Sequence, residues 1–312
     1  MIICISANPA IDRRLWLKDL QLGGVNRVSL VSSDLGGKAA HVAIAARELG
    51  SEVSWVGFLG GVMGAECERA LDAHGIPAEI VRIRSSTRLN QEIIESDGTT
   101  TEVLEPGGAI EEDERDKLFA VCRRLFDRYR SEAQVVISGS LPPGLPHTFY
   151  ASLIEAAHGY GCFVLLDTSG EAMLASLQSS PDLIKPNREE AERAWGQRII
   201  DETSALAAAR SFIDRSAKSV ALSLGSDGML WLASPDAQPI MVRAPVITGR
   251  STVGCGDATL AGLAVGNCYE NLREKAVLAV ACGAANCVAD APGMIDAKEV
   301  NRLVPLVEVK SL

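Results

Sequence analysis

Thr252-Val253-Gly254-Cys255-Gly256-Asp257 stands directly before an Ala/Leu/Gly-rich stretch, Ala258 to about Val265, that predicts a helix. A helix start leaves backbone N–H groups without partners and carries the positive end of the helix dipole. Glycine lets a phosphate approach such amides closely, so the stretch predicts an anion site. A carboxylate alone would repel the phosphate there, so its presence suggests a separate function. Asp257 is therefore either a base that deprotonates a hydroxyl or only a helix cap.

Along the rest of the chain, short β-branched runs alternate with helical patterns. Most of the runs are apolar on both faces, as buried strands of a parallel sheet are. The alternation predicts a mostly parallel sheet with helices on both faces, in which ligands bind at the carboxyl ends of the strands. We expect strands at 2–5, 52–57, 135–138, 162–167, 182–185 and 219–224, and helices at 39–49, 64–74, 111–130, 146–160, 189–195, 204–215 and 273–288.

Two segments, about 12–34 and 87–106, lack helical spacing and lie outside this alternation. In the second, apolar and polar residues alternate up to an Asp97-Gly98 turn. We expect antiparallel strands that form a small separate β-sheet, either a lid or a dimer surface, inserted into a single domain that spans 1–312.

Composition narrows the class of protein. The chain has 312 residues, 47% of them hydrophobic, which is enough for the core of one large α/β domain. Its net charge of −10 argues against a nucleic-acid partner. No segment approaches 18 apolar residues or has the form of a signal peptide, so we expect a cytoplasmic protein without a membrane partner. The eight cysteines are scattered without a CxxC pair and are expected to be reduced.

A second glycine-rich helix start carries a cation. Gly36-Gly37-Lys38 precedes the predicted helix 39–49 and indicates either a substrate anion site or a turn with a solvated lysine. Asp12 follows the first strand, where a carboxylate can accept hydrogen bonds from sugar hydroxyls or simply face solvent. Arg88 and Asn90 share one face of a predicted lid strand, which suits a phosphate and a hydroxyl or a solvated surface.

Two further turns are candidates for a nucleotide. Asn187 and Glu190 face the same side of a helix start, where they could hold Mg²⁺ through water or form a capping box. Residues 223–228, Ser-Leu-Gly-Ser-Asp-Gly, could contact a nucleotide or form a plain hairpin turn. A GxxxxGK[ST] phosphate loop and a GxGxxG fingerprint after a strand are both missing, which disfavours a generic GTPase or dehydrogenase.

Taken in order, these motifs resemble those of the ribokinase-like (PfkB) family of carbohydrate kinases. Segments 8–12, 25–27, 87–90, 105–107 and 138–144 look like the branch with 1-phosphofructokinase, tagatose-6-phosphate kinase and the minor 6-phosphofructokinase. The resemblance implies a three-layer αβα sandwich with a β-sheet lid, ATP as donor, Mg²⁺, and usually a homodimer through the lids. It leaves open whether a monovalent cation assists. The motifs that carry it are Gly36-Gly37-Lys38, Lys185-Pro186-Asn187-x-x-Glu190, Ser223-x-Gly225-x-x-Gly228 and Thr252-Val253-Gly254-x-Gly256-Asp257.

The resemblance also implies a role for each matched residue. Asp257 is the base, and the amides of Gly254, Cys255 and Gly256 form an anion hole for the transferred phosphoryl group. The phosphosugar is expected at Asp12, Arg27, Gly36, Gly37, Lys38, Arg88, Asn90 and Ser138. The nucleotide is expected at Lys185, Asn187, Glu190, Ser223, Gly225, Gly228 and Asn286, with Mg²⁺ organised by Asn187 and Glu190.

The chain departs from the family pattern at two places. The family usually has Gly-Gly-Lys-Gly-x-Asn, whereas residues 36–41 are Gly-Gly-Lys-Ala-Ala-His. His41 thus replaces an amide that would contact a sugar hydroxyl, and we expect it either to contact the sugar or to be a core residue. Cys255 replaces the more usual alanine, and its place at a helix start predicts a lowered pKa.

These expectations converge on an ATP-dependent kinase that makes a bisphosphate from fructose 1-phosphate, fructose 6-phosphate or tagatose 6-phosphate. Arg27, Arg88 and Asn90 favour a phosphorylated ketohexose. One alternative is a kinase for an unphosphorylated sugar or nucleoside in the same fold. Another is a non-catalytic sugar-phosphate-binding protein, against which the intact Asp257 and the Asn187/Glu190 pair argue.

Overall fold

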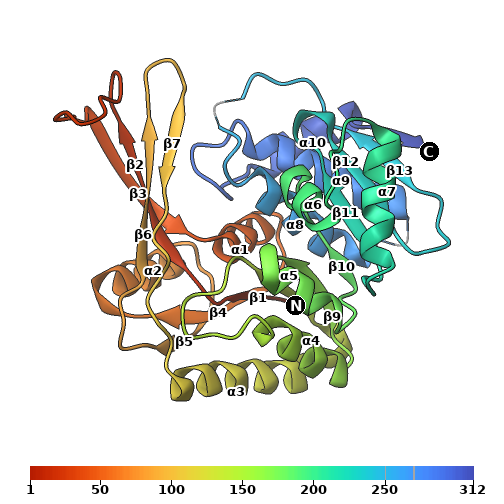
Figure 1. The fold of residues 1–312 in the computed structure, drawn as a ribbon, viewed down its shortest axis with the longest axis horizontal. Helices are drawn as coiled ribbons and strands as arrows, with labels where there is room; N and C mark the ends of the chain where they lie inside the picture. The colour runs from red at the N-terminus through yellow and green to blue at the C-terminus, as the bar shows by residue number, and fades with distance from the viewer. Residues whose placement is uncertain (250, 270) are drawn as a thin grey trace.

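Two sheets of different size organise the structure, a computed structural model that describes residues 1–249, 251–269 and 271–312 (Figure 1). The larger sheet has ten strands, and most of them are buried on both faces, as strands covered by helices are. These strands are β1 (Ile2–Ser6), β4 (Val53–Leu59), β5 (Ala78–Arg82), β8 (Gln134–Ser138), β9 (Phe163–Asp167), β10 (Leu183–Ile184), β11 (Val220–Ser223), β12 (Met229–Leu232), β13 (Ile240–Arg243) and β14 (Glu308–Ser311).

The strand order of this sheet is β14-β13-β12-β11-β10-β9-β8-β1-β4-β5. Neighbouring strands from β11 to β5 are parallel, which confirms the predicted mostly parallel sheet. Strands β12, β13 and β14 extend one edge in antiparallel pairs. The hairpin alternative for residues 223–228 implies β12, but β13 and β14 were not predicted, because each has only 4 residues and so short a run shows no clear periodicity.

Helices cover both faces of the larger sheet and produce the expected three layers (Figure 1). Successive side chains of β1 alternate between the two faces, so that Ile2 and Cys4 join one apolar cluster and Ile3 and Ile5 join the other. The first cluster includes residues of α1 (Lys38–Glu48), α2 (Gly61–Ala73), α8 (Cys255–Val265), α9 (Leu272–Asn286) and α10 (Ala297–Leu303). The second includes residues of α3 (Glu112–Tyr129), α4 (Phe149–Gly159), α5 (Gly170–Leu177), α6 (Arg188–Trp195) and α7 (Glu202–Ile213).

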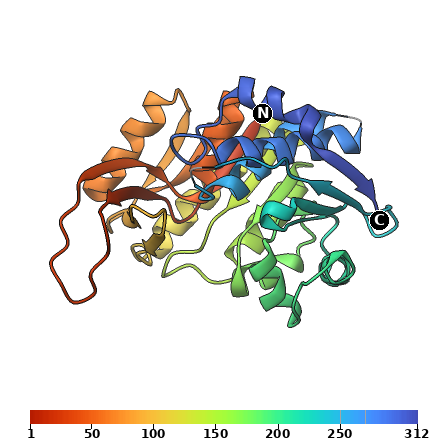
Figure 2. The same ribbon diagram turned by 90° about the horizontal axis from the view of Figure 1, so that it is seen from above.

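The smaller sheet stands beside this body in both views (Figures 1 and 2). Its strand order is β3-β2-β6-β7, formed by β2 (Ala10–Trp16), β3 (Leu30–Gly36), β6 (Arg88–Ile94) and β7 (Thr100–Val103). Each of the two hairpins is antiparallel, as expected, but β2 and β6 join the hairpins in parallel. Within the described ranges, no helix combines the length and the apolar composition that a membrane span requires.

Candidate active site

The start of α8 has the geometry of an anion site. Its N-cap residue, Gly254, has a φ of +79°, in the left-handed region that favours glycine. A Cβ at Gly254 would also lie 2.7 Å from the Cβ of Pro292, so no side chain fits there. Within the described residues, the amides of Gly254 and Gly256 donate no hydrogen bond, and that of Cys255 donates only a long 3.3 Å bond to Thr252. The loop therefore presents amides that an anion can use.

Asp257 does not cap this helix. Gly254 is the N-cap residue and no side chain makes a capping hydrogen bond, so the simple capping alternative is wrong. The Asp257 carboxylate is buried and instead lies against His41 of α1. The Nδ1 atom of His41 is 2.8 Å from Oδ2 of Asp257, which leaves Oδ1 of Asp257 for a ligand.

His41 joins two carboxylates. Its Nε2 atom lies 3.4 Å from Oδ2 of Asp12, on the side opposite Asp257. Burial alone would lower the pKa of His41, but the hydrogen bonds and charges of Asp12 and Asp257 outweigh it and raise that pKa to about 10. His41 is therefore an imidazolium at neutral pH, and both ring nitrogens are engaged. His41 is thus a buried residue that contacts two candidate site residues, and its expected contact with a sugar stays a prediction.

The inner face of the smaller sheet meets His41 through Asp12. Asn90 on β6 donates a 2.8 Å hydrogen bond from Nδ2 to Oδ1 of Asp12 on β2, its register partner. Gly36 on β3 lies so close that any Cβ would collide with the Asp12 carboxylate. Glu92, the next residue along this face of β6, is also buried, and burial raises its pKa. Arg88, Asn90 and Glu92 are two positions apart in turn and so share one face of the strand. Sequence reasoning identified the first two and missed Glu92.

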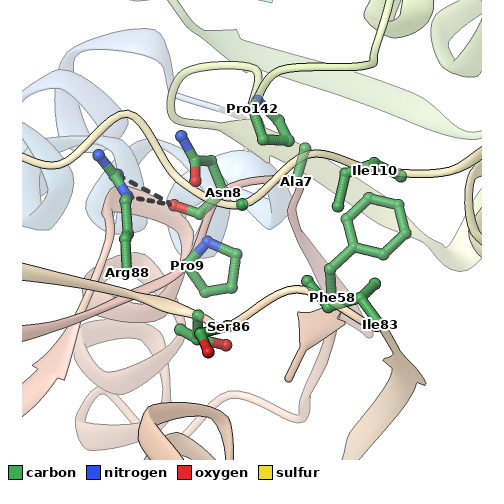
Figure 3. Close-up of a pocket in the computed structure, with 11 residues that line it drawn as sticks. Ala7, Asn8, Pro9, Phe58, Ile83, Ser86, Arg88, Ile110 and Pro142 are labelled. Carbon is green, nitrogen blue, oxygen red and sulfur yellow. Dashed lines mark hydrogen bonds between the residues drawn. The ribbon is translucent and has the colours of Figure 1, made fainter. Parts of the chain in front are cut away.

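Arg88 turns its guanidinium toward the chain that follows β1 (Figure 3). Its Nε and Nη2 atoms lie 3.2 and 3.0 Å from the carbonyl oxygen of Asn8, and Nη1 lies 3.1 Å from that of Glu105. Backbone carbonyls thus fix Arg88 at the edge of the site. A small cavity, which does not include Asp257, lies beside this contact and is lined in part by Ala7, Pro9, Phe58, Ser86 and Ile110.

Lysines converge on a buried carboxylate at the end of β9. Lys38 Nζ lies 3.0 Å from Oδ1 of Asp167, and Lys185 Nζ lies 3.0 Å from Oδ2. Burial opposes the charge of Asp167, but the two lysines hold its pKa below the usual value. A Cβ at Gly256 would lie 3.2 Å from Lys185 Nζ, so this cluster adjoins the start of α8. Sequence reasoning missed Asp167, although it ends a predicted strand at its carboxyl end.

Asn187 and Glu190 form the capping box that was one of the two expectations. The Asn187 side chain accepts from the Glu190 amide at 2.8 Å, and Oε2 of Glu190 accepts from the Asn187 amide at 2.8 Å. Oε1 of Glu190 remains outside the box and lies 3.5 Å from Lys38 Nζ. Nowhere in the described residues do three or more His, Cys, Asp or Glu side chains gather as a metal site. The single carboxylate fits Mg²⁺ that is held mainly by phosphates and water.

The Ser223 turn lies next to the Asn187 segment. Ser223 forms a parallel bridge with Asn187, and its amide donates a 3.0 Å bond to the Pro186 carbonyl. Gly225 and Gly228 both have positive φ angles in the turn between β11 and β12, as the hairpin alternative requires. The turn thus stands beside Asn187 at the carboxyl ends of β10 and β11.

Asn286, at the end of α9, is engaged with the segments around the α8 loop. Its Nδ2 donates to the Val253 carbonyl at 2.7 Å, and its Oδ1 accepts from the Gly293 amide at 2.8 Å. The segment that follows reaches the smaller sheet, because Arg14 on β2 donates a 2.8 Å bond to the carbonyl of Asp290. Residues 286–293 therefore contact the loop before α8 and the smaller sheet.

Buried polar atoms without partners surround the site. In the described residues, Oγ of Ser138, Oδ1 of Asn90 and Oγ1 of Thr168 have no hydrogen-bond partner in the protein. Buried polar groups are ordinarily paired, so such atoms indicate where a polar ligand binds. Ser138 and Thr168 stand at the carboxyl ends of β8 and β9, as ligand-binding residues of parallel sheets do.

Arg27 is not brought to this cluster. It is exposed in the connection between β2 and β3, which projects from the far end of the smaller sheet (Figures 1 and 2). Its expected contact with a substrate phosphate therefore stays a prediction.

The expectation of a lowered pKa at Cys255 is wrong. A hydrogen bond with Cys287, together with burial, raises the pKa of Cys255. The same hydrogen bond lowers the pKa of Cys287 to about 7. All eight cysteines are free, as expected.

Comparison with known proteins gives consistent results. A model of the pfkB family carbohydrate kinases matches residues 4–300. The chain is 36% identical over 267 residues to a 1-phosphofructokinase of Xanthomonas campestris pv. campestris, covering 84% of this chain and 82% of the relative. It is 32% identical over 313 residues to a tagatose-6-phosphate kinase of Staphylococcus epidermidis, covering 99% of each. The structure of phosphofructokinase-2 from Escherichia coli in complex with potassium superposes with a TM-score of 0.90 at 27% identity, covering 97% of this chain and 98% of that one.

Proposed function

The chain belongs to the pfkB family of carbohydrate kinases, and on that basis we propose that it transfers the γ-phosphoryl group of ATP to a hydroxyl of a ketohexose phosphate. Fructose 1-phosphate, tagatose 6-phosphate and fructose 6-phosphate are the candidate acceptors. The observation that carries the proposal is the buried Asp257 carboxylate beside the open amides of Gly254 and Gly256. A base and an anion site lie together there, as phosphoryl transfer requires.

Asp257 is the proposed general base. Its Oδ2 is held by His41, which leaves Oδ1 to accept the proton of the acceptor hydroxyl. The N–H groups of residues 254–256 donate to the equatorial oxygens of the phosphoryl group as it passes between donor and acceptor. Lys38 and Lys185 place positive charge beside the same loop. Most of the rate enhancement is then expected from positioning and electrostatics.

His41 is the proposed positioning residue of the site. It connects the base to Asp12, which is hydrogen-bonded to Asn90 on the smaller sheet. The imidazolium also offsets the repulsion between two buried carboxylates. Asp12 and Asn90 are the groups proposed to contact sugar hydroxyls. The unpartnered oxygens of Asn90 and Ser138 support a polar ligand in this place.

Glu190 and Asn187 are proposed to hold Mg²⁺ through water, with the phosphates of the nucleotide as its other ligands. The metal would supply positive charge to the phosphates. Ser223, Gly225 and Gly228 are proposed to line the nucleotide site beside Asn187. Because one solved relative is in complex with potassium, stimulation by K⁺ is a further part of the proposal.

A homodimer through the smaller sheet is also proposed. Large apolar side chains are exposed on this sheet and its connections, which is unusual for a surface that stays in water. Burial of these side chains against a second copy would remove them from solvent. They are Leu22, Val25, Val28, Leu30, Val31, Val103 and Leu104.

ADP release measured against a panel of phosphorylated and free sugars tests the proposed reaction. We expect turnover with at least one ketohexose phosphate, and Asp257→Asn serves as the matched control for contaminating kinases. Activity on free sugars or nucleosides alone would overturn the choice of a phosphosugar. Product analysis by NMR then identifies the phosphorylated hydroxyl.

A further inference from the structure

Two cysteines that are distant in sequence meet beside the proposed anion hole. The sulfur atoms of Cys255 and Cys287 lie 3.1 Å apart, although 32 residues separate them. A disulfide bond has an S–S distance of about 2.05 Å, so a closure of about 1 Å separates the two thiols from a covalent link. Both side chains are half-buried, and Cys255 is the first residue of α8.

Close packing of α8 on α9 holds the cysteines in register. A Cβ at Gly262 of α8 would lie 2.6 Å from the Cα of Ala279 on α9. Nearer the cysteines, a Cβ at Gly283 of α9 would collide with the Thr259 hydroxyl of α8. Helix backbones in such contact leave their ends little freedom to separate. The geometry of the thiol pair is therefore set by the scaffold and not by the loop alone.

The pair is also chemically suited to oxidation. A thiolate, not a thiol, attacks an oxidant, and the hydrogen bond with Cys255 lowers the pKa of Cys287 to about 7. Phosphoryl transfer as proposed above uses only the backbone amide of Cys255. Neither sulfur atom has a task in that reaction.

We propose that Cys255 and Cys287 form a reversible redox pair, which a peroxide joins in a disulfide that slows phosphoryl transfer and which a thiol reductant reopens. The formation of the bond stands on the geometry of the two sulfur atoms. Its inhibitory effect rests on the proposed function of the residue 254–256 amides.

The chemistry balances in two steps. The Cys287 thiolate attacks one oxygen of hydrogen peroxide, which breaks the O–O bond, releases hydroxide and leaves a sulfenic acid on Cys287. The Cys255 sulfur, as it loses its proton, attacks the Cys287 sulfur and expels hydroxide. Two thiols and one peroxide thus become one disulfide and two molecules of water, and the two electrons lost by sulfur reduce the O–O bond.

The disulfide acts on the loop through the Cys255 backbone. The end of α9 already contacts the loop, because Asn286 binds the Val253 carbonyl and the Ser251 amide donates a 3.4 Å bond to the Cys287 carbonyl. Formation of the disulfide draws Cys255 toward Cys287. This movement displaces the backbone amide of Cys255 and restricts the loop. Because a misplacement of about 1 Å can cost about 100-fold in rate, we expect turnover to fall by about 10- to 100-fold.

Peptide mapping of the purified full chain tests the bond itself. After treatment with hydrogen peroxide, digestion with trypsin and Asp-N should release a linked peptide pair whose fragment ions assign the bond to Cys255 and Cys287. Fragment ions are needed because Cys282 lies on the same peptide as Cys287. Dithiothreitol should abolish the linked pair. A peroxide-inactivated enzyme that contains no such link would overturn the proposal without the use of any variant.

Activity measurements test the switch. Cys287→Ser, whose side chain has no proposed task in catalysis, should keep its turnover in peroxide, and Cys287→Ala should do the same if the serine variant folds poorly. Cys268→Ser removes an exposed thiol at the other end of α8 and should leave the sensitivity unchanged. Equal inactivation of the Cys287 variants would overturn the proposal. A disulfide that forms while turnover stays unchanged would overturn the proposed inhibition. The kinase reaction itself is tested independently by Asp257→Asn.

Discussion

The carboxylate of Asp257 is held by His41, whose Nδ1 atom lies 2.8 Å from Oδ2 of the aspartate. His41 stands where the family pattern usually has an asparagine. It places a cation next to the proposed base and connects that base to helix α1.

Asp257→Asn should abolish most turnover and leave binding intact. The amide keeps the shape of the side chain but cannot accept the hydroxyl proton, and general bases contribute roughly 10²- to 10⁴-fold. Calorimetry should find affinities for ATP and the sugar phosphate similar to those of the wild type. An unchanged rate of ADP release would show that Asp257 is not the base.

His41→Leu should lower turnover more than His41→Asn, because asparagine can still donate to one of the two carboxylates. The pKa of His41 is raised from about 6.5 to about 10, so its contribution to stability is complete below pH 6.5 and is lost as the pH rises toward 10. Thermal unfolding of wild type and His41→Asn between pH 6 and 10 measures this. The difference in Tm should shrink with rising pH, and a difference that grows would contradict a charged imidazole.

Gly254→Ala should impair both folding of the loop and turnover. A residue with a side chain at a φ of +79° costs about 1–2 kcal/mol, and its Cβ would also meet Pro292. Gly159→Ala is the matched control, because a Cβ there meets nothing within 4 Å in a helical position. That control should be neutral or stabilise by up to about 1 kcal/mol. Urea unfolding and ADP release compare the two variants.

Asp167→Asn should destabilise the protein by roughly 3–5 kcal/mol, since it leaves Lys38 and Lys185 without their buried counter-ion. The pKa of Asp167 is lowered, so its contribution is present above pH 3.8 and is lost as the pH falls below that value. Asp113→Asn, in an exposed pair with Arg84, should change stability much less, because solvent screens that pair. Similar denaturation midpoints for both variants would refute the buried role of Asp167.

Val31→Glu should separate the proposed dimer into monomers. It places a charge on the exposed apolar surface of the smaller sheet without touching its inner face. Light scattering after gel filtration measures the mass directly. A wild-type protein that is monomeric at micromolar concentration would refute the dimer, and Arg69→Glu on α2 serves as a control for the added charge.

The fold was largely predictable because periodicity is strong in long elements. Helices α1, α3 and α9 begin and end within two residues of their expected limits. The parallel pairing of β2 with β6 was not predictable, because the two strands are far apart in the chain and alternate alike in either direction. Strands β13 and β14 were missed because they are too short to show a period.

The parts of the site that depend on backbone geometry and sequence motifs could be predicted. The contacts between its side chains could be predicted less well. The residue types at Gly254 and Asp257 follow from what an anion site and a base require. The partners of His41 could not be predicted in this way, because an imidazole on a helix can hydrogen-bond equally well to water, a backbone carbonyl or a carboxylate. Asp167 was missed because a single aspartate at a strand end carries no pattern. Only the fold brings Lys38 and Lys185 to it.

The segment from Asn286 to Gly293 connects the loop before α8 to the smaller sheet. It holds the Val253 carbonyl at one end, and in its middle it accepts a hydrogen bond from Arg14 of the smaller sheet. A sugar phosphate that moves the smaller sheet must then also bias the loop that receives the nucleotide. By thermodynamic reciprocity, any change that one substrate causes in the affinity for the other must occur by the same factor in both directions. We therefore expect the two substrates to be coupled through this short stretch of chain, which joins the loop before α8 to the smaller sheet.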